Sequence, residues 1–337
     1  EFNISPTNGG GNIVPTGTTY TWSAPTISPS AGAITGGTAQ SVAQSSIKQL
    51  LTNTTDQIAT ATYTVTPKAG LCSGATFQVV ITVNPAPKVI FSDADNKQAL
   101  CSGGTSEEVN LSSVTTGNIS FSWTANVPTG ITGAITTGNN TIPPQTLSNS
   151  TNAPLDIIYS ARANLNNSLD CHGSIFDYKI TVYPVAKVNT VNNVTLCNNE
   201  NSTVIAFGSN VTGTTYKWEN DNTSIGLAAT GNGNLPVFTA INTGLSPIVA
   251  NITVTPTANG CEGIKSSFII TINPTPTVDK PSDQIVCNGF TTTDVIFTGN
   301  INTATYNWTN DKPGIGLAAS GTGNIPSFTA INTGATA

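Results

Sequence analysis

The chain has 337 residues, of which only 8% are charged, and its formal net charge is −6 at a sequence pI of about 4.6. Its 11 Lys and Arg residues form no cluster. This excludes the grouped cations that bind nucleic-acid phosphates or an anionic membrane surface. No apolar run reaches the roughly 18 to 20 residues of a membrane-spanning helix, so no direct membrane insertion is expected.

One short pattern occurs four times along the chain. It consists of Thr or Ser, an aromatic residue, any residue and Trp, and it occupies residues 19–22, 120–123, 215–218 and 305–308. The four tryptophans therefore lie 101, 95 and 90 residues apart. Residues 210–244 and 300–334 are identical at 22 of 35 positions. A repeat of this length predicts a string of domains, each large enough to have its own core.

The elements predicted within each repeat are short β-strands. In the first repeat, residues 62–66 alternate in polarity, and a turn leads from them to the apolar run at 77–83. The third repeat contains the same pair of runs at 251–255 and 268–272. Runs rich in Val, Ile and Thr between Gly, Pro and Asn residues are typical of strands, and no stretch has helical periodicity. The sequence therefore predicts an all-β protein of tandem immunoglobulin-like β-sandwich domains.

Proline-containing linkers follow the last predicted strand of each repeat. They divide the chain into domains at residues 1–86, 87–184, 185–274 and 275–337. Short linkers with proline are semi-rigid, so we expect the domains to form an extended array. Because the first and last repeats are incomplete, we also expect a window of a longer polypeptide, with targeting and anchoring signals outside it.

The tryptophans are the strongest candidates for core residues. Each lies in an alternating strand of its repeat, at Trp22, Trp123, Trp218 and Trp308. In immunoglobulin-type domains a Trp on a central strand packs between the two sheets. The alternative is a platform on which sugar rings stack. Recurrence in every copy favours the core, because a binding platform need not occur in all domains.

Two cysteines occupy equivalent positions in each complete repeat. They are Cys101 and Cys171 in the second repeat and Cys197 and Cys261 in the third, while Cys72 and Cys287 belong to the incomplete repeats. We predict the disulfides Cys101–Cys171 and Cys197–Cys261, formed in an oxidising compartment, with buried free thiols as the alternative. One objection is that a simple sandwich places the two members at opposite ends, beyond the ~7 Å limit between bridged Cα atoms. Zinc binding lacks both a Cys-x-x-Cys motif and a histidine partner.

No segment has a clear signature for a cofactor or a catalytic site. Asp93 and Asp95 are candidate calcium ligands, because closely spaced carboxylates suit that cation, and an acidic turn is the alternative. His172, the single histidine, is interpreted as a loop residue, so no nucleophilic system can be assembled and the chain is not expected to be an enzyme. The glycine-rich segments 231–234 and 321–324 are interpreted as loops without a phosphate, because no helix follows them.

The residues around the cysteines carry a resemblance to a known family. Residues 260–263 before the run 268–272, residues 284–289 and the Tyr-x-Trp pattern resemble the PKD-like and immunoglobulin-like repeats of giant surface proteins in Bacteroidota. The gliding motility adhesins are among these proteins. The resemblance covers the whole chain and brings no catalytic residues with it.

This resemblance implies a location, a function and partners. It implies an extracellular, cell-surface, outer-membrane-associated protein exported by the type IX secretion system. The chain would be a repeat segment of a very long adhesin, forming an extended stalk used in surface attachment and gliding. Its partners would be surface polysaccharide or a solid substratum, with the outer-membrane motility and secretion machinery engaging regions outside this chain. The alternatives are a carbohydrate-binding array and accessory domains of a secreted polysaccharide-degrading enzyme.

Overall fold

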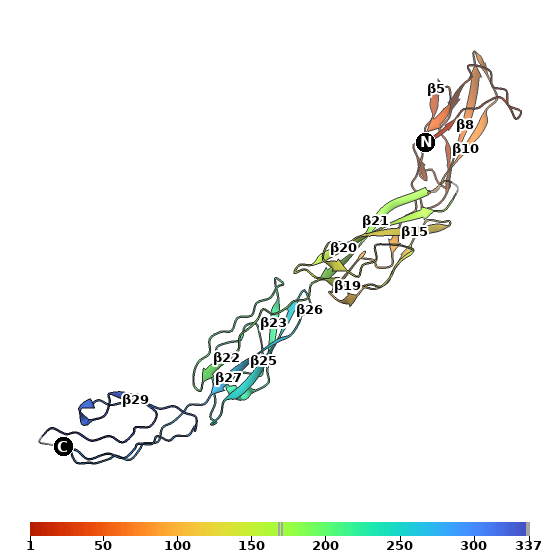
Figure 1. Cartoon of the computed structure of the whole chain (residues 1–337). Helices are drawn as coiled ribbons and strands as arrows, with labels where there is room; N and C mark the ends of the chain where they lie inside the picture. The colour runs from red at the N-terminus through yellow and green to blue at the C-terminus, as the bar shows by residue number, and fades with distance from the viewer. Residues whose placement is uncertain (168, 170, 335–337) are drawn as a thin grey trace. The chain divides into compact units, whose positions relative to one another are not determined.

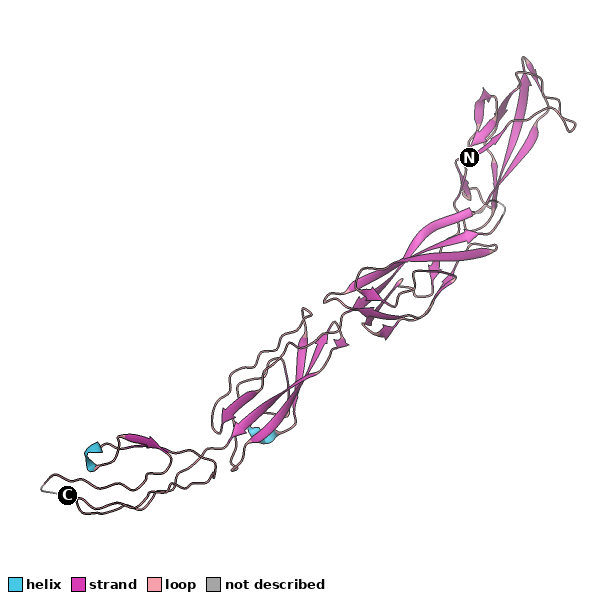
Figure 2. Cartoon of the chain, viewed as in Figure 1, coloured by secondary structure: helices cyan, strands magenta, loops and turns pink. Residues whose placement is uncertain are grey.

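The computed structural model describes residues 1–167, 169 and 171–334 (Figure 1). Within these residues the regular structure is β-strand apart from two short 3₁₀ helices, η1 (Thr223–Ile225) and η2 (Pro313–Ile315) (Figure 2). The all-β prediction is confirmed. Among the described residues, none of the helices has the length and apolar character needed to cross a membrane. The chain divides into two compact units, Glu1–Pro184 and Val185–Ala337.

The first repeat builds its core around one long central strand. Its strands are β1 (Phe2–Ile4), β2 (Thr19–Trp22), β3 (Thr26–Ser28), β4 (Ile34–Thr35), β5 (Gln40–Gln44), β6 (Ile47–Gln49), β7 (Thr52–Asn53), β8 (Ala59–Ala69), β9 (Cys72–Ser73) and β10 (Phe77–Val83). The main sheet has the order β10-β8-β2-β5, with β3 and β9 also paired to β8. Alternate residues of β8 point into the core, including Tyr63 and Val65, as the alternation at 62–66 predicts.

The second repeat has a large sheet covered by smaller ones. Its strands are β11 (Ile90–Phe91), β12 (Lys97–Cys101), β13 (Gly104–Thr105), β14 (Val109–Ser112), β15 (Ile119–Asn126), β16 (Ile131–Thr132), β17 (Thr137–Asn139), β18 (Thr141–Ile142), β19 (Thr146–Asn149), β20 (Leu155–Leu165) and β21 (Cys171–Tyr183). The five-stranded sheet has the order β12-β21-β20-β15-β17. Its buried side chains meet those of β14, β18 and β19 in one hydrophobic core.

Unit 2 contains the third and fourth repeats. Its strands are β22 (Val194–Cys197), β23 (Thr215–Asn220), β24 (Thr230–Asn232), β25 (Ile248–Ala258), β26 (Cys261–Glu262), β27 (Ser266–Asn273), β28 (Asn307–Thr309) and β29 (Ser320–Thr322). The main sheet has the order β22-β27-β25-β23-β24, with β26 also paired to β25. Figure 1 shows β25 and β27 lying along one another, and their inner faces line the core of the third repeat.

One pairing sets the direction of the first strand in both complete repeats. β12 runs parallel to β21, and β22 runs parallel to β27, whereas the other paired strands of these sheets are antiparallel. The first strand therefore ends at the same end of the domain as the last strand. This end is the one from which the chain leaves the repeat.

Candidate functional site

The tryptophans lie in the domain cores, with one exception. Trp22, Trp123 and Trp218 have exposed fractions of 5%, 3% and 2%, so none of them presents a ring for stacking on a sugar. Trp308 is only half-buried, which differs from the prediction. Val254 of β25 lies opposite Trp218, and the described part of the fourth repeat, residues 275–334, contains no counterpart of that strand.

Each tryptophan of the last three repeats lies against a glycine of the adjacent strand. The cross-strand pairs are Trp123 with Gly138, Trp218 with Gly231 and Trp308 with Gly321. A Cβ atom added to Gly231 would lie 2.2 Å from Cζ2 of Trp218 and 2.5 Å from Cε2. The glycine is therefore required for space, since the indole ring occupies the place of a side chain.

This contact corrects the loop interpretation of the glycine-rich segments. Gly231 lies in β24 and Gly321 in β29, so both segments begin as strands rather than as loops. The available signal was spacing, because each glycine follows the Trp of its repeat by 13 residues. This spacing does not by itself predict a strand, because glycine has a low intrinsic preference for strands. Only the Trp on the neighbouring strand explains why glycine occurs there.

An asparagine lies at the C-terminal end of each of the first three repeats, buried in the second and third and half-buried in the first. Its side-chain NH₂ group donates two hydrogen bonds of 2.7–2.9 Å. One goes to the backbone carbonyl four residues later, and the other to a carbonyl at the end of the last strand of the repeat. The donor and its two acceptors are Asn53 with Gln57 and Val83, Asn149 with Ala153 and Val182, and Asn242 with Ser246 and Ile272. The Oδ1 atom accepts a backbone N–H two residues later in every case. We call these residues the asparagine clamps.

The clamps fix the place where the chain leaves a repeat. Each one ties a crossing loop to the strand that precedes a proline-containing linker, as Asn242 does between residues 242–246 and β27. The two hydrogen bonds of the amide hold both segments in place. Without the amide, two carbonyl groups would lack their hydrogen-bond donor. The pattern Ile-Asn-Thr-Gly occurs at residues 241–244 and again at 331–334, and this recurrence is the sequence signal by which the clamp could have been found.

The calcium candidates lie in a turn whose carboxylate is engaged by protein donors. Asp93 accepts the backbone N–H of Asp95 on Oδ1 at 3.1 Å and the hydroxyl of Tyr178 on Oδ2 at 2.9 Å. Burial, and then this bond to Asp93, raise the pKa of the Tyr178 phenol well above its usual range. The described residues contain no group of three or more Asp, Glu, His or Cys suited to a metal ion. The acidic-turn interpretation fits this geometry.

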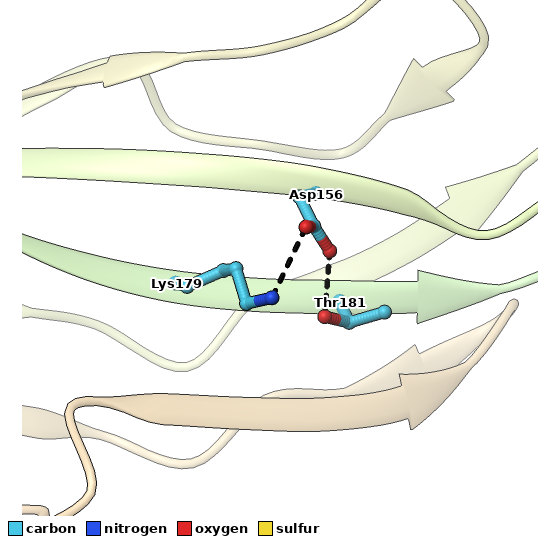
Figure 3. A network of polar contacts seen from close by, with 3 residues as sticks. All are labelled: Asp156, Lys179 and Thr181. Atoms are coloured by element: carbon cyan, nitrogen blue, oxygen red, sulfur yellow. Dashed lines mark hydrogen bonds and ion pairs between the residues drawn. The ribbon is translucent and has the colours of Figure 1, made fainter.

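The sheet surface of the second repeat carries a small polar network (Figure 3). Asp156 of β20 accepts the hydroxyl of Thr181 at 2.6 Å and forms an ion pair with Lys179 at 3.2 Å. The Thr181 bond, followed by Lys179, lowers the pKa of the Asp156 carboxyl. His172 is exposed as expected, but it lies in β21 rather than in a loop, and its Nδ1 lies 2.7 Å from Oδ1 of Asn164 on β20. These groups form cross-strand surface pairs, and none of them lies in a cleft suited to substrate chemistry.

A groove in the first repeat has a volume of about 550 Å³ and is lined by Ile13, Tyr20, Cys72 and Phe77, among others. Tyr20 is buried, and its ring packs edge-on against Phe77 at a centroid distance of 6.4 Å. Tyr20 therefore offers no free ring face on which a sugar could stack.

The cysteines do not form the predicted intradomain pairs. Cys101 and Cys261 are disulfide-bonded, whereas Cys171 and Cys197 are free, as are Cys72 and Cys287. The predictions Cys101–Cys171 and Cys197–Cys261 are therefore wrong.

The parallel first strand explains this result. Cys197 lies opposite Asn273, at the end of β27, whereas Cys261 pairs with Ala258 at the other end of the sheet. The 8 residues of β27 separate them, which amounts to about 25 Å at ~3.3 Å per residue and exceeds the ~7 Å limit for a bridge. In the second repeat the 13 residues of β21 separate Cys171 from the strand end beside Cys101. The objection drawn from the sequence was correct.

Comparison with solved structures finds cadherin repeats of low similarity. A protocadherin gammaB7 structure of repeats 3–6 is 11% identical at a TM-score of 0.32, covering 99% of this chain and 87% of that chain. Mouse cadherin-23 repeats 22–24 are 12% identical at a TM-score of 0.31, covering 77% and 86%. The human desmocollin-1 ectodomain is 9% identical at a TM-score of 0.30, covering 94% and 68%. At these scores no functional conclusion rests on the likeness.

Comparison with protein families gives a definite result. No curated protein matches the sequence. The PKD-like domain family matches residues 7–87 and 98–186, which together make up half of the chain. The matched segments contain Trp22 and Trp123 and most of the core residues around them. With its tandem immunoglobulin-like β-sandwich repeats, this chain belongs to the PKD-like domain family.

Proposed function

We propose that the chain is a repeat segment of a long cell-surface adhesin, in which the PKD-like domains form an extended stalk. The observation that carries this proposal is the way in which the first and last strands of a repeat are held together at the end of the domain. The first strand runs parallel to the last strand, and an asparagine clamp secures the last strand just before a short proline-containing linker. Such ends suit domains that transmit tension from one to the next.

The parallel pairing decides how a repeat resists tension. In the third repeat, tension enters at the start of β22 and leaves at the end of β27. Because the two strands run in the same direction, tension pulls them lengthwise past each other. The hydrogen bonds of the ladder are then loaded together rather than broken one after another. The same holds for β12 and β21 in the second repeat.

The finer proposal concerns the biological setting. The resemblance of the cysteine and Tyr-x-Trp segments to Bacteroidota surface repeats supports an SprB-type gliding motility adhesin. Such a protein would be exported by the type IX secretion system and held at the outer membrane. Its partners would be surface polysaccharide or a solid substratum, while the motility machinery engages other regions. We propose a mechanical role for this segment, without catalysis.

Small-angle scattering on the isolated chain tests the stalk. A domain with strands of seven to ten residues is about 25 to 35 Å long, so four domains in line should exceed ~100 Å in maximum dimension. A maximum dimension close to that of a compact sphere would contradict the proposal.

A replacement experiment separates a spacer from a ligand-binding array. This segment would be exchanged, in the full-length surface protein, for the same number of unrelated immunoglobulin-like domains. A stalk predicts that cells still attach to a surface. Loss of attachment, together with binding of the isolated segment on a glycan array, would instead support the carbohydrate-binding alternative.

A further inference from the structure

We propose that the groove of the first repeat is a binding site for an extended peptide segment with the residue pattern Pro-x-(Pro or Ala)-x-Val. This groove has a volume of about 550 Å³, and its lining includes Pro15, Pro67 and Gly74. We call it the head groove. Its occupant has the chemistry of this chain's own linkers, which carry the pattern at residues 85–89, 184–188 and 274–278. In the second and third repeats, the equivalent site holds such a linker.

The third repeat shows the site occupied. The carbonyl oxygen of Ala186 accepts the backbone N–H of Ile264 at 2.8 Å. Ala186 is buried in a small apolar cluster with Val211 and Ala258. A Cβ atom added to Gly263 would overlap the same carbonyl oxygen and lie 2.9 Å from the carbonyl carbon. Because Gly263 has no positive φ, its glycine is explained by the space that the linker needs.

The second repeat shows the same arrangement with another linker residue. Pro87 is buried, and its carbonyl group lies against Gly173. A Cβ atom on this glycine would overlap the oxygen and lie 2.9 Å from the carbon, as in the third repeat. Each of the two glycines is the third residue of a Cys-x-Gly sequence, at 171–173 and 261–263. The Pro87 contact lies within unit 1, and the Ala186 contact lies within unit 2.

One wall of the head groove is built from the same hairpin residues. The sequence Thr-Val-Thr-Pro precedes the hairpin in the first and third repeats, and it ends at Pro67 and Pro256. Seven residues later comes the glycine of Cys-x-Gly, which is Gly74 or Gly263. Each glycine donates its backbone N–H to the carbonyl of its proline, at 2.9 Å in the first repeat and 2.8 Å in the third. The two hairpins therefore present the same surface to a linker.

The opposite wall is equivalent as well. Thr18 donates its hydroxyl to the carbonyl of Pro15 at 2.7 Å, just as Thr214 donates to Val211 at 2.6 Å. Val211 is only 4% exposed beside its linker, whereas Pro15 is exposed and Ile13 at the rim is 89% exposed. The first repeat thus has both walls of the site, and they are open to solvent.

Two features of the open groove indicate a peptide carbonyl as the ligand. Gly74 has no positive φ, and a Cβ atom there would meet only Pro67, at 3.1 Å from its ring, which a small shift of the ring relieves. The first repeat therefore does not itself require this glycine, whereas an incoming carbonyl group does. Ala75 takes the place of Ile264, and within the described residues its N–H has no protein acceptor. Gly74 and Ala75 thus reproduce the pair that holds Ala186.

The walls define the chemistry of the occupant. Apart from the N–H of Ala75, the contact is apolar, so proline or a small apolar residue fits at the central position. The valine two residues later is buried in both occupied repeats, at Val89 and Val188. A proline two residues earlier keeps the segment extended before binding, which lowers the entropy lost on binding. Val14 stands where the third repeat has Asn210, whose side chain accepts a linker N–H at 2.7 Å, so the head groove offers one hydrogen bond fewer.

Titration of the intact chain with a synthetic peptide of residues 84–91 tests the site. An attached linker acts at an effective concentration of about millimolar, so the peptide is added to several millimolar. We expect saturable changes of the Gly74 and Ala75 signals in NMR spectra, with the Ala75 amide proton moving downfield as its hydrogen bond forms. A peptide of the same composition in scrambled order is the control. Gly74→Ala should weaken binding by at least about tenfold, because its Cβ occupies the place of the carbonyl oxygen.

Two results of this titration would overturn the proposal. One is the absence of a saturable change, or an equal response to the scrambled peptide. The other is a change of the same signals when the concentration of the chain alone is raised, because a second copy would then fill the groove. If the proposed stalk holds, the site fastens the start of one repeat to the linker of another. Peptide binding by a chain that scatters as a compact particle would contradict the stalk alone, and an extended chain that binds no peptide would contradict this site alone.

Hydrogen exchange on two matched glycine variants tests the same site within the chain. Gly263→Ala places a methyl group against an occupied site and should speed the exchange of the Ile264 amide by about tenfold or more. Gly74→Ala makes the same change at the open site and should leave the protection of the β8 and β10 amides within about threefold, which also shows that this variant folds. Comparable losses of protection in both repeats would mean that the glycine serves the hairpin itself and would contradict the proposal.

Discussion

Replacement of Gly231 by alanine tests whether the indole of Trp218 requires a residue without a side chain beside it. An alanine Cβ at this position would lie 2.2 Å from Cζ2 of Trp218, which is 1.2 Å short of the 3.4 Å at which ordinary contact begins. Trp218 is only 2% exposed, so its ring is enclosed by the core and cannot move aside freely. We therefore expect either β24 or the indole to shift.

The expected cost follows from the size of this overlap. Forcing one extra carbon into a well-packed core typically costs about 1 to 3 kcal/mol. In a Trp218→Leu background the three clashing ring atoms, Cζ2, Cε2 and Nε1, are absent. The same Gly231→Ala change should then cost less than about 0.5 kcal/mol, which gives a coupling energy of at least ~1 kcal/mol in the double-mutant cycle.

Native-state hydrogen exchange is the suitable assay, because a chain of several domains does not unfold in one two-state step. Protection of the β25 amides, including Val254 opposite Trp218, reports the stability of the third repeat alone. Gly32→Ala is the control, measured on the β8 amides of its own repeat, since a Cβ there meets nothing within 4 Å. An equal cost of Gly231→Ala in both backgrounds would refute the steric explanation.

Three further predictions concern the clamp, the half-buried tryptophan and the surface network. Asn242→Asp should lower the melting temperature of the third repeat, because two buried carbonyl groups lose their hydrogen-bond donor. Each lost hydrogen bond should reduce the free energy of unfolding by about 1 to 3 kcal/mol. An unchanged melting curve would contradict the role of the clamp. Trp218→Ala should cost about 3 to 5 kcal/mol by hydrogen exchange, and Trp308→Ala clearly less, whereas equal costs would show that burial does not set the difference. Thr181→Val should raise the pKa of Asp156 towards its ordinary value in an NMR titration. Because the pKa of Asp156 is lowered in the folded state, the contribution of this carboxylate to the free energy of unfolding is complete above pH ~4 and is lost as the pH falls through the folded pKa. The exposure of the side chain limits this contribution to below about 1 kcal/mol.

Much of the fold could be predicted from local sequence patterns. The run 77–83 coincides with β10, and the run 268–272 lies within β27. Alternation and β-branched residues identified these strands because both properties depend on neighbours along the chain. The position of each Trp in a strand could be predicted for the same reason. The glycine opposite it could not, because its neighbour lies on another strand.

The sequence alone determined the all-β class, the period of the repeats and the equivalence of the cysteines in successive copies. Only the tertiary structure decided which cysteines can meet. The parallel pairing of β22 with β27 places Cys197 and Cys261 at opposite ends of one domain, and that register is a long-range property. The same holds for Asn242, which reaches Ile272 across 30 residues. Periodicity records which way a side chain faces, whereas the partner it meets depends on how the strands come together in space.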